Sequence, residues 1–497
     1  MLTTLLLIAI GLLAAPPTLA ACRSLIVIPL RLWLGAARPA AAAAPRDWPP
    51  VTVQLAIYRE SVVLERLLRS ILAIDYPRDR MRIQIVDDSE ADDAERSRAI
   101  VAMLASQGVT IDYLQRPKRV GYKAGALNFG MAQIDDELIA FFDADFEARP
   151  DFLKTLVPAF DDPSVGGIQA RWDYMNDTDR PVTQMQAGVF DKMFSFEIDV
   201  RSRLGRPALF LGSNGMFRRA ALNGIGGWKE QPFTSEDLDV SYRIHVAGWK
   251  LLYEPRPLGL TELPETYLPY LQQQRRWARG MTRVFLDHVG TMLTTRRQRL
   301  LEYLEGSLIV FQVGMPFVAL LPLVMLAYVG LGLERNAAWA WEQALLFIGI
   351  VTPPVMIEVL VAQKVHYADW RSRARRVLQA APLAMGLAVS MLAGVFETLT
   401  ASQGEFVRTP KQGQLGIVRN SVGSWLRGFL PVLAAQWTLA AACAITVALA
   451  AWRGYWEVLP LMVSMGSGFF ISAAHASAEL RRKSRTAAAA QAAVAKA

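Results

Sequence analysis

The stretch ELIAFFDADFEARPDFL, residues 137–153, decides the fold of this chain. In it a continuous apolar run at 138–142 leads directly into two carboxylates, Asp143 and Asp145. A short apolar run of this kind predicts a strand buried on both faces, which is typical of parallel sheets covered by helices. Ligands of such sheets bind at the carboxyl ends of the strands. The sequence therefore predicts an α/β domain with an acidic site at one edge of its sheet.

The neighbouring segments repeat the same alternation of strand and helix. The expected strands are 51–58, 82–89, 109–116 and 137–146, and the expected helices are 60–73, 92–106 and 124–134. Strands that alternate with helices in this way predict a parallel sheet with helices on both faces. Charges stay frequent and apolar runs stay short up to about residue 300, so one globular domain is expected over residues 51–300.

Composition excludes several classes of protein. The chain has 497 residues, of which 53% are hydrophobic and 20% charged, so it is too apolar for a disordered protein or an ordinary soluble enzyme. Its two cysteines, Cys22 and Cys443, exclude a disulfide scaffold and a cysteine-rich zinc module. The net charge of +8 is compatible with nucleic acid, anionic lipid or anionic small substrates. No basic–aromatic stripe occurs, so no nucleic-acid partner is expected.

Apolar segments long enough to cross a membrane lie on both sides of the globular part. The expected spans are 1–22, 307–333, 338–362, 429–452 and 455–475. Residues 23–50 form a basic, Ala/Pro-rich linker, and residues 476–497 form a cytosolic tail. Residues 1–22 contain no basic residue, so a retained anchor fits them better than a signal peptide or a lipoprotein leader.

Positive charge sets the expected orientation. Arginines and lysine gather in two clusters, which are Arg371, Arg373, Arg375 and Arg376, and then Arg481, Arg482, Lys483 and Arg485. If both clusters and the globular domain are cytosolic, residues 377–401 cannot cross, and they are expected to be interfacial or re-entrant. A sixth span at 377–401 is the alternative. The expected location is the inner (plasma) membrane, with membrane lipid as a partner.

Three further groups of polar residues accompany the acidic strand end. Asp88 follows the second expected strand, and Glu236 and Asp237 open a helical pattern. Each carboxylate alone has an ordinary explanation, as a turn residue or as a residue that stabilises a helix N-terminus. Gln273, Arg276 and Trp277, in YLQQQRRWARG, combine a fork-shaped cation with an aromatic face, which suits a diphosphate beside a sugar. An amphipathic helix near a membrane explains that set equally well.

Taken in order, these motifs resemble those of the processive family 2 glycosyltransferases: D, DxD, ED and QxxRW. The similarity is greatest to cellulose-synthase-like proteins that make β-mannan or β-glucan backbones. Five further segments carry the resemblance, which are GYKAGALN (121–128), FDADFEARPDFL (142–153), IQARWDYMN (168–176), FLGSNGMFRRAALNGIGGWK (210–229) and FVRTPK (406–411). The resemblance implies an α/β, Rossmann-like GT-A domain, cytosolic and inserted between transmembrane helices.

The resemblance also implies roles for individual residues. The residues expected to bind the nucleotide-sugar donor are Tyr58, Glu60, Asp88, Lys123, Asp143, Asp145, Gln273 and Arg276. Asp145, assisted by Asp143, would hold Mg²⁺ or Mn²⁺ on the diphosphate. Asp237, with Glu236 beside it, would be the catalytic base of an inverting displacement. Arg59 stands where the family usually has Asn, which leaves the nucleotide preference open.

Further residues are expected on the acceptor side of the reaction. The residues expected to bind the acceptor are Trp277, Phe210, Gly212 and Ser213. The segment 402–420 resembles a gating loop, with Phe406, Arg408, Thr409 and Lys411 as its functional residues. Glu358, an acid within an expected span, is a candidate for lining an export path, or for a charge masked at a helix contact.

Three functions compete on this evidence. The first is a processive enzyme that uses UDP-glucose or GDP-mannose type donors to extend and export a β-linked glycan. The second is a one-step enzyme that glycosylates a membrane lipid such as diacylglycerol or ceramide, and the third is a non-enzymatic transporter or scaffold. The intact acidic motifs disfavour the third, and the gating-loop-like segment favours the first. An accessory export or regulatory protein is a further candidate partner.

Overall fold

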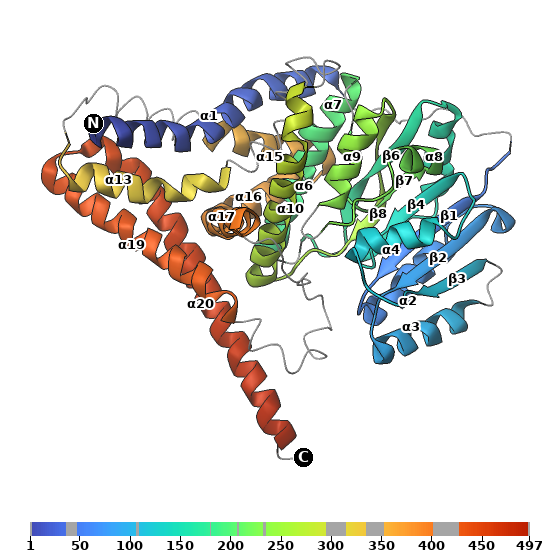
Figure 1. The fold of residues 1–497 in the computed structure, drawn as a ribbon. Helices are drawn as coiled ribbons and strands as arrows, with labels where there is room; N and C mark the ends of the chain where they lie inside the picture. Colours follow the sequence, from blue (N-terminus) through green and yellow to red (C-terminus); the bar gives the residue numbers. More distant parts are fainter. Residues whose placement is uncertain are drawn as a thin grey trace.

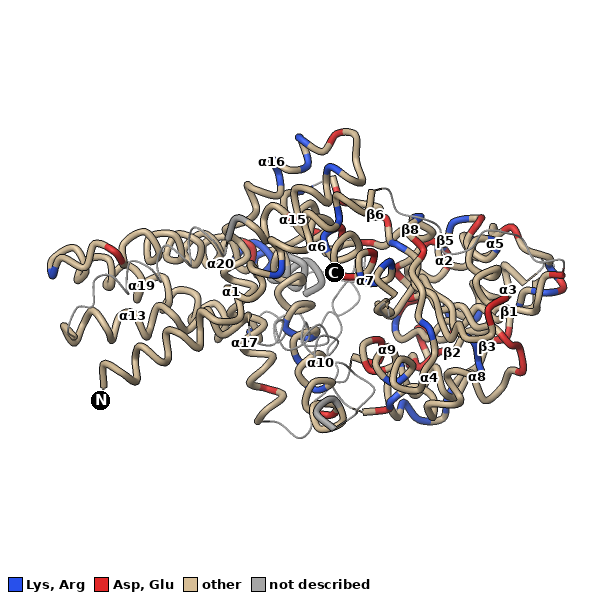
Figure 2. Tube along the Cα trace, turned by 90° about the horizontal axis from the view of Figure 1, so that it is seen from above, with Lys and Arg blue, Asp and Glu red and all other residues tan. Residues whose placement is uncertain are grey.

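The strand-and-helix domain and a group of long helices lie at opposite sides of the molecule (Figure 1). This computed structural model describes residues 2–35, 47–105, 109–178, 180–205, 208–231, 235–294, 315–333, 352–400 and 427–495. Charged residues gather in the sheet domain, whereas α13, α19 and the N-terminal half of α1 contain few of them (Figure 2). This division agrees with a globular domain attached to a membrane-embedded part.

Eight strands form one sheet, in the order β3-β2-β1-β4-β7-β6-β8-β5. Their bounds are β1 Val51–Ile57, β2 Met81–Asp87, β3 Thr110–Gln115, β4 Leu138–Phe142, β5 Phe146–Ala148, β6 Val165–Tyr174, β7 Gly215–Arg218 and β8 Lys250–Thr261. The first four strands in the sheet order are parallel, as expected. Strands β1 and β4 are buried along nearly their whole length because helices cover both of their faces.

The expectation of a parallel sheet is wrong for β7 and β5, whereas β6 and β8 pair in parallel. Strand β7 runs antiparallel to both β4 and β6, and β5 runs antiparallel to β8. Strand β7 fills the gap between β4 and β6 and returns the chain toward α8. The reversal has a consequence for the site, because the loop that leads into β7 ends beside the carboxyl end of β4. The sheet is therefore mixed.

Helices of the sheet domain cover its faces and lead toward the membrane part. Their bounds are α2 Ser61–Leu72, α3 Ala91–Leu104, α4 Tyr122–Met131, α5 Phe152–Leu156, α6 Pro181–Lys192, α7 Asp199–Arg203, α8 Arg219–Gly224, α9 Glu236–Val246 and α10 Tyr267–Thr294. The shorter turns are η1 Arg78–Arg80, η3 Val157–Asp161 and the π-helical η4 Met193–Ile198. The three helices expected between the first strands are confirmed as α2, α3 and α4.

The remaining helices are largely apolar. They are α1 Leu2–Leu34, α13 Leu321–Gly330, α15 Thr352–His366, α16 Trp370–Ala380, α17 Ala384–Thr400, α19 Leu430–Arg453 and α20 Leu459–Ala495, with the 3₁₀ turns η5 Met315–Leu320, η7 Ala381–Leu383 and η9 Trp456–Val458. The exception is α16, which carries Arg371, Arg373, Arg375 and Arg376. By length and composition, four helical stretches among the described residues can cross a membrane, namely Leu2–Leu34, Trp370–Thr400, Leu430–Arg453 and Trp456–Thr486. The expected spans 307–333 and 338–362 lie partly outside the described residues.

The N-terminal helix is longer than the expected anchor at 1–22. It continues through Arg23 to Leu34, into the segment expected to be a linker. Charge does not end it, because its arginines are paired with acids of the sheet domain. Arg23 Nη2 lies 2.5 Å from Glu197 Oε2, and Arg31 Nε lies 3.3 Å from Asp199 Oδ2. The continued helix therefore joins the membrane part to η4 and α7.

Helix α17 has a different direction from the other long helices. It is seen end-on in Figure 1, where α1 and α13 run across the view. Its side chains pack on α10, and Ser390 Oγ donates a hydrogen bond to the carbonyl of Leu271 at 2.9 Å. Residues 370–400 are nevertheless long and apolar enough to cross a membrane, so an interfacial or re-entrant segment at 377–401 stays a prediction beside the alternative of a sixth span.

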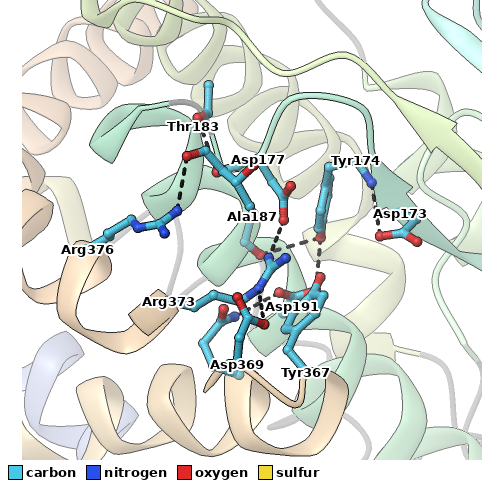
Figure 3. A network of polar contacts seen from close by, with 12 residues as sticks. Asp173, Tyr174, Asp177, Thr183, Ala187, Asp191, Tyr367, Asp369, Arg373 and Arg376 are labelled. Carbon is cyan, nitrogen blue, oxygen red and sulfur yellow. Dashed lines mark hydrogen bonds and ion pairs between the residues drawn. The ribbon is translucent and has the colours of Figure 1, made fainter. Parts of the chain in front are cut away.

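Polar contacts show which helix ends meet the sheet domain. Figure 3 shows Arg373 of α16 paired with Asp177, and Tyr367 Oη donating to Asp191 Oδ1 of α6 at 3.3 Å. Arg376 Nη1 also donates to the carbonyl of Thr178 at 3.0 Å. The basic helix α16 thus lies against the sheet domain, which supports placing both on one side of the membrane.

The C-terminal helix α20 approaches the sheet domain at its basic end. Glu479 Oε2 accepts hydrogen bonds from the backbone N–H groups of Tyr267, at 2.9 Å, and Leu268, at 3.1 Å. At the opposite end of the hairpin, Arg453 Nη1 donates to the carbonyl of Val329 at 2.7 Å. The two helices of this hairpin, α19 and α20, therefore reach from the sheet domain to the far end of α13.

Candidate active site

The two carboxylates after β4 lie in a fixed turn. The backbone N–H of Phe146 donates to the carbonyl of Asp143 at 3.1 Å, which closes the turn around Asp145. The backbone N–H of Asp143 donates to Ser213 Oγ at 2.9 Å, and Ser213 is buried in the loop that enters β7. The antiparallel neighbour of β4 thus holds the acidic turn in place, as the mixed sheet allows.

Lys123, near the start of α4, lies at the centre of the acidic residues. Its Nζ is 2.7 Å from Asp143 Oδ1 and 3.3 Å from Glu236 Oε1, and it donates to the carbonyl of Gly212 at 3.0 Å. Burial disfavours the ammonium, but Asp143 and Glu236 outweigh it and raise the pKa of Lys123 above its ordinary value. Lys123 therefore stays charged and links three segments that are distant in sequence.

Asp237 lies in the first turn of α9, close to Lys123. Its Oδ1 accepts a hydrogen bond from the backbone N–H of Leu238 at 2.8 Å. A Cβ at Gly212, where φ is +87°, would lie 3.3 Å from Asp237 Oδ2 and 3.5 Å from Lys123 Nζ. Burial raises the pKa of Asp237 to about 6, with Glu236 adding to the rise and Lys123 opposing it. A carboxylate with this pKa is a competent proton acceptor near neutral pH.

Helix α10 brings Gln273, Arg276 and Trp277 to the same region. The buried guanidinium of Arg276 interacts electrostatically with four carboxylates, those of Glu236, Asp143, Asp237 and Asp145. Burial lowers the pKa of Arg276 and these acids oppose the change. Gln273 Oε1 is buried and accepts no hydrogen bond from the part of the chain that the structure describes. Trp277 packs edge-to-face on Phe190, with ring centroids 5.7 Å apart.

The expected nucleoside-binding residues lie at the ends of β1 and β2. The ring of Tyr58 has the guanidinium of Arg119 3.5 Å from its centroid, and its hydroxyl donates to Glu90 Oε1 at 3.0 Å. Glu60 is buried at the start of α2, where its Oε2 accepts from the backbone N–H of Tyr58 at 3.4 Å. A cation beside an exposed aromatic ring and carboxylate is a suitable environment for a nucleobase.

Asp88 is held by an arginine that the sequence analysis missed. Both of its oxygens accept hydrogen bonds from Arg116, and the Nε–Oδ1 distance is 2.7 Å. Arg116 Nη1 also donates to the carbonyl of Val120 at 2.8 Å, and its Nη2 donates to that of Tyr122 at 3.0 Å. Arg116 directly follows β3, so the rule that strand ends carry site residues could have found both it and Arg119.

Some expected residues are placed elsewhere or are not described. The side chain of Phe210 is fully buried in the core, edge-to-face with Phe217 at 4.9 Å, so the prediction that it contacts an acceptor is wrong for the side chain. Gly212 and Ser213, two and three residues further on, do reach the acidic site. Four gating-loop residues lie outside the described residues, namely Phe406, Arg408, Thr409 and Lys411.

Glu358 belongs to a helix contact. Its buried carboxylate lies 3.4 Å from Arg23 Nη1 and 3.1 Å from Lys192 Nζ. Glu197 joins the same group through Arg23 and Lys192. The charge is thus masked between α1, α6 and α15, which supports the second of the two expectations for this residue.

The donor set fits a hard divalent cation that is shared with a substrate. Asp143 and Asp145 supply carboxylate oxygens one residue apart, which suits Mg²⁺ or Mn²⁺. Among the described residues, no group of three or more His, Cys, Asp or Glu side chains could hold a metal ion. Two carboxylates bind such an ion well only together with other ligands, and phosphate oxygens of a substrate are the natural complement.

Comparisons with known proteins agree with this geometry. Residues 138–361 match the family described as "Glycosyl transferase family group 2". The probable glucomannan 4-beta-mannosyltransferase 7 of Oryza sativa subsp. japonica is 35% identical over 281 residues, which are 55% of this chain and 48% of that protein. Glucomannan 4-beta-mannosyltransferase 2 of Arabidopsis thaliana is 34% identical over 258 residues, which are 51% of this chain and 48% of that protein.

A solved structure shares the fold. The mannosyltransferase PcManGT from Pyrobaculum calidifontis, in complex with GDP-Man and Mn²⁺, superimposes with a TM-score of 0.54 at 18% sequence identity. The superposition covers 81% of this chain and 100% of that one. The predicted GT-A fold is thereby confirmed. The aligned residues of the two plant relatives span about half the length of those proteins.

Proposed function

Because the chain contains a domain of glycosyl transferase family group 2, we propose that it transfers a sugar from a nucleoside diphosphate to a growing β-linked glycan. One observation carries the proposal. Lys123, Asp143, Glu236, Asp237 and Arg276 come from four separate segments and meet at one edge of the sheet. A carboxylate with its pKa raised to about 6, beside an arginine and a lysine from other segments, is typical of a catalytic site.

The donor diphosphate would bind between the acidic turn and α10. Arg276 and Lys123 supply positive charge where negative charge develops on the departing nucleoside diphosphate. A divalent cation held by Asp143 and Asp145 would neutralise the two phosphates and act as a Lewis acid. Tyr58, Asp88 and Glu60 would hold the nucleoside, with Arg116 keeping Asp88 in position.

Asp237 would act as the general base. Its carboxylate accepts the proton of the acceptor hydroxyl as the oxygen of that hydroxyl bonds to the anomeric carbon, and the bond from that carbon to the diphosphate oxygen breaks. Attack from the face opposite the leaving group inverts the anomeric centre, so an α-linked donor gives a β-linked product. Trp277, beside Gln273, would stack on the terminal acceptor sugar.

The names of the plant relatives favour a mannosyl donor, of the GDP-mannose type, over a glucosyl donor of the UDP-glucose type. We further propose that the sheet domain faces the cytosol, and that the apolar helices carry the product outward. The contacts of the basic segments of α16 and α20 with the sheet domain support this orientation.

The test uses membranes that contain the full chain, labelled UDP- and GDP-sugars, and Mg²⁺ or Mn²⁺. Product is separated into high-molecular-weight polymer and chloroform-soluble lipid. Label in the polymer, from one donor, is the expected result, and it identifies the sugar. Label in the lipid fraction alone contradicts the polymer proposal and makes the protein a glycolipid synthase.

The pKa of Asp237 predicts how the rate depends on pH. Because its pKa is raised to about 6, this carboxyl is protonated below pH 6 and cannot accept a proton there. We expect kcat/KM for the donor to fall about tenfold per pH unit below 6, and to level off above it. A kcat/KM that stays constant from pH 4.5 to 7.5 would contradict the assignment of Asp237.

Removal of divalent cations should stop transfer. Treatment of the membranes with EDTA is expected to abolish product formation, because the diphosphate then leaves without charge neutralisation at Asp143 and Asp145. Mn²⁺ or Mg²⁺ added in excess should restore the initial rate, whereas K⁺ should not. Undiminished turnover in EDTA would show that the two carboxylates have another role.

A further inference from the structure

We propose that Glu397 of α17 is a positioning residue for the transfer reaction, because it fixes the helix that carries Gln273, Arg276 and Trp277. This inference rests on the function proposed above and adds to it a residue that lies outside the motifs.

Helix α10 makes contacts on two different faces, one toward the acidic site and one toward α17. Gln273, Arg276 and Trp277 are three and four residues apart, so they share the face toward the acidic site. Arg275 and Arg279 are four residues apart and lie on a different face. There Glu397 forms an ion pair with Arg275, and its Oε2 lies 3.4 Å from Arg279 Nη1. One carboxylate thus ties together two successive turns of α10.

The contact around Glu397 is closely packed. Ser390 Oγ donates to the carbonyl of Leu271 at 2.9 Å, and Thr398 Oγ1 donates to the carbonyl of Arg279 at 3.3 Å. Between them, a Cβ at Gly394 would lie 2.4 Å from the carbonyl oxygen of Arg275, so the two backbones nearly touch. The hydroxyls fix how far α10 slides along α17, and the ion pairs of Glu397 fix how it rotates.

Helix α10 in turn supports the helix of the catalytic base. A Cβ at Gly280 would lie 3.0 Å from both Cβ and the backbone nitrogen of Ser235, which precedes Glu236 and Asp237. Further along, His288 Nε2 lies 2.7 Å from Asp239 Oδ1, two residues after the base. A rotation of α10 therefore displaces Arg276 and Asp237 together, although Glu397 touches neither.

The test compares Glu397→Gln with a matched control in the full-length protein in lipid nanodiscs. Asp369→Asn removes another carboxylate paired with an arginine, Arg373, at 3.0 Å, but at the N-terminus of α16. We expect Glu397→Gln to lower kcat about tenfold or more, since small displacements of reacting groups are costly. The KM for the donor should change less than about threefold, because Tyr58 and Asp88 still hold the nucleoside. Asp369→Asn should leave both constants unchanged.

A second measurement does not depend on activity. Hydrogen exchange of the α10 amides should increase in Glu397→Gln and in Arg275→Gln/Arg279→Gln, with no further increase in the triple variant, because all remove the same ion pairs. It should not change in Asp369→Asn. Wild-type protein without transferase activity would refute the proposed function, while this exchange pattern would still support the positioning role. Unchanged α10 exchange or unchanged kcat in Glu397→Gln would overturn it.

Discussion

The Asp237→Asn variant is expected to lose transfer by about 10²–10⁴-fold while it still binds the nucleoside diphosphate. Asparagine keeps the shape of the side chain but cannot accept the proton of the acceptor hydroxyl. The raised pKa of Asp237 means that the folded protein disfavours its charged form, so removal of that charge should not lower stability at neutral pH. Transfer by the variant in membranes is the measurement, with thermal unfolding as a check on folding.

The matched control for this variant is Asp162→Asn. Asp162 is a surface carboxylate that pairs with Lys250 at 2.8 Å, and it precedes β6 at the edge of the sheet opposite the acidic turn. Its replacement should leave the rate of transfer unchanged. If Asp237→Asn transfers sugar at the wild-type rate, another residue is the base and the assignment of roles in the acidic site is wrong.

Replacement of Lys123 by methionine should have the second large effect, a loss of about 10²–10³-fold in transfer. The ammonium links Asp143, Glu236 and the Gly212 carbonyl, and without it these acidic groups repel one another and the donor diphosphate. Methionine has a similar length, so packing is largely kept. The rate of transfer at pH 7.5 is the measurement.

The Lys123→Met variant also shifts the pH dependence in a defined direction. Lys123 lowers the pKa of Asp237, so its loss raises that pKa further, and the acidic limb of the kcat/KM profile moves to higher pH. Lys154→Met, which removes a surface lysine 2.6 Å from Asp75, is the control and should leave the profile in place. If the acidic limb of the kcat/KM profile of Lys123→Met lies at an unchanged or lower pH, Lys123 does not lower the pKa of the catalytic base.

The first half of the sheet could be predicted because local sequence specifies it. Strands β1, β2, β3 and β4 are short apolar runs, and helices separate the first three from one another and from β4 in the chain, so the parallel arrangement follows from general rules. The polar motifs could be placed for the same reason, since Asp88 and Asp143 directly follow strands. Motif order then led to Asp237 and Arg276, which the structure brings to the same edge.

The second half of the sheet and several contacts of the site depend on long-range interactions that leave no local pattern in the sequence. Strand β7 has four residues, and nothing in them indicates that they run antiparallel to β4 and β6. Phe210 lies beside the functional Gly212, and only the fold decides that its ring belongs to the core. The Glu397 contacts join residues of two different helices, so sequence spacing does not reveal them, whereas Arg116 directly follows a strand and could have been found.

The length of an apolar segment also does not by itself predict the direction or the end of the helix that it forms. Residues 370–400 are long and apolar enough to cross a membrane, but their hydropathy does not predict that α17 lies across the direction of α1 and α13 and packs on α10. Conversely, α1 continues past Arg23 because Glu197 and Asp199 of the sheet domain pair with its arginines. Partner charges, which a hydropathy argument does not include, explain the second difference.

The most direct test of the proposed chemistry follows the anomeric configuration of the product. Membranes with the full chain are supplied with the α-linked nucleotide sugar that they use, and the new linkage is assigned by NMR or by digestion with β- and α-specific glycosidases. A β-linkage that Asp237→Asn membranes do not form is the predicted result. An α-linkage, or equal β-linked product from Asp237→Asn, would contradict a single displacement with Asp237 as its base.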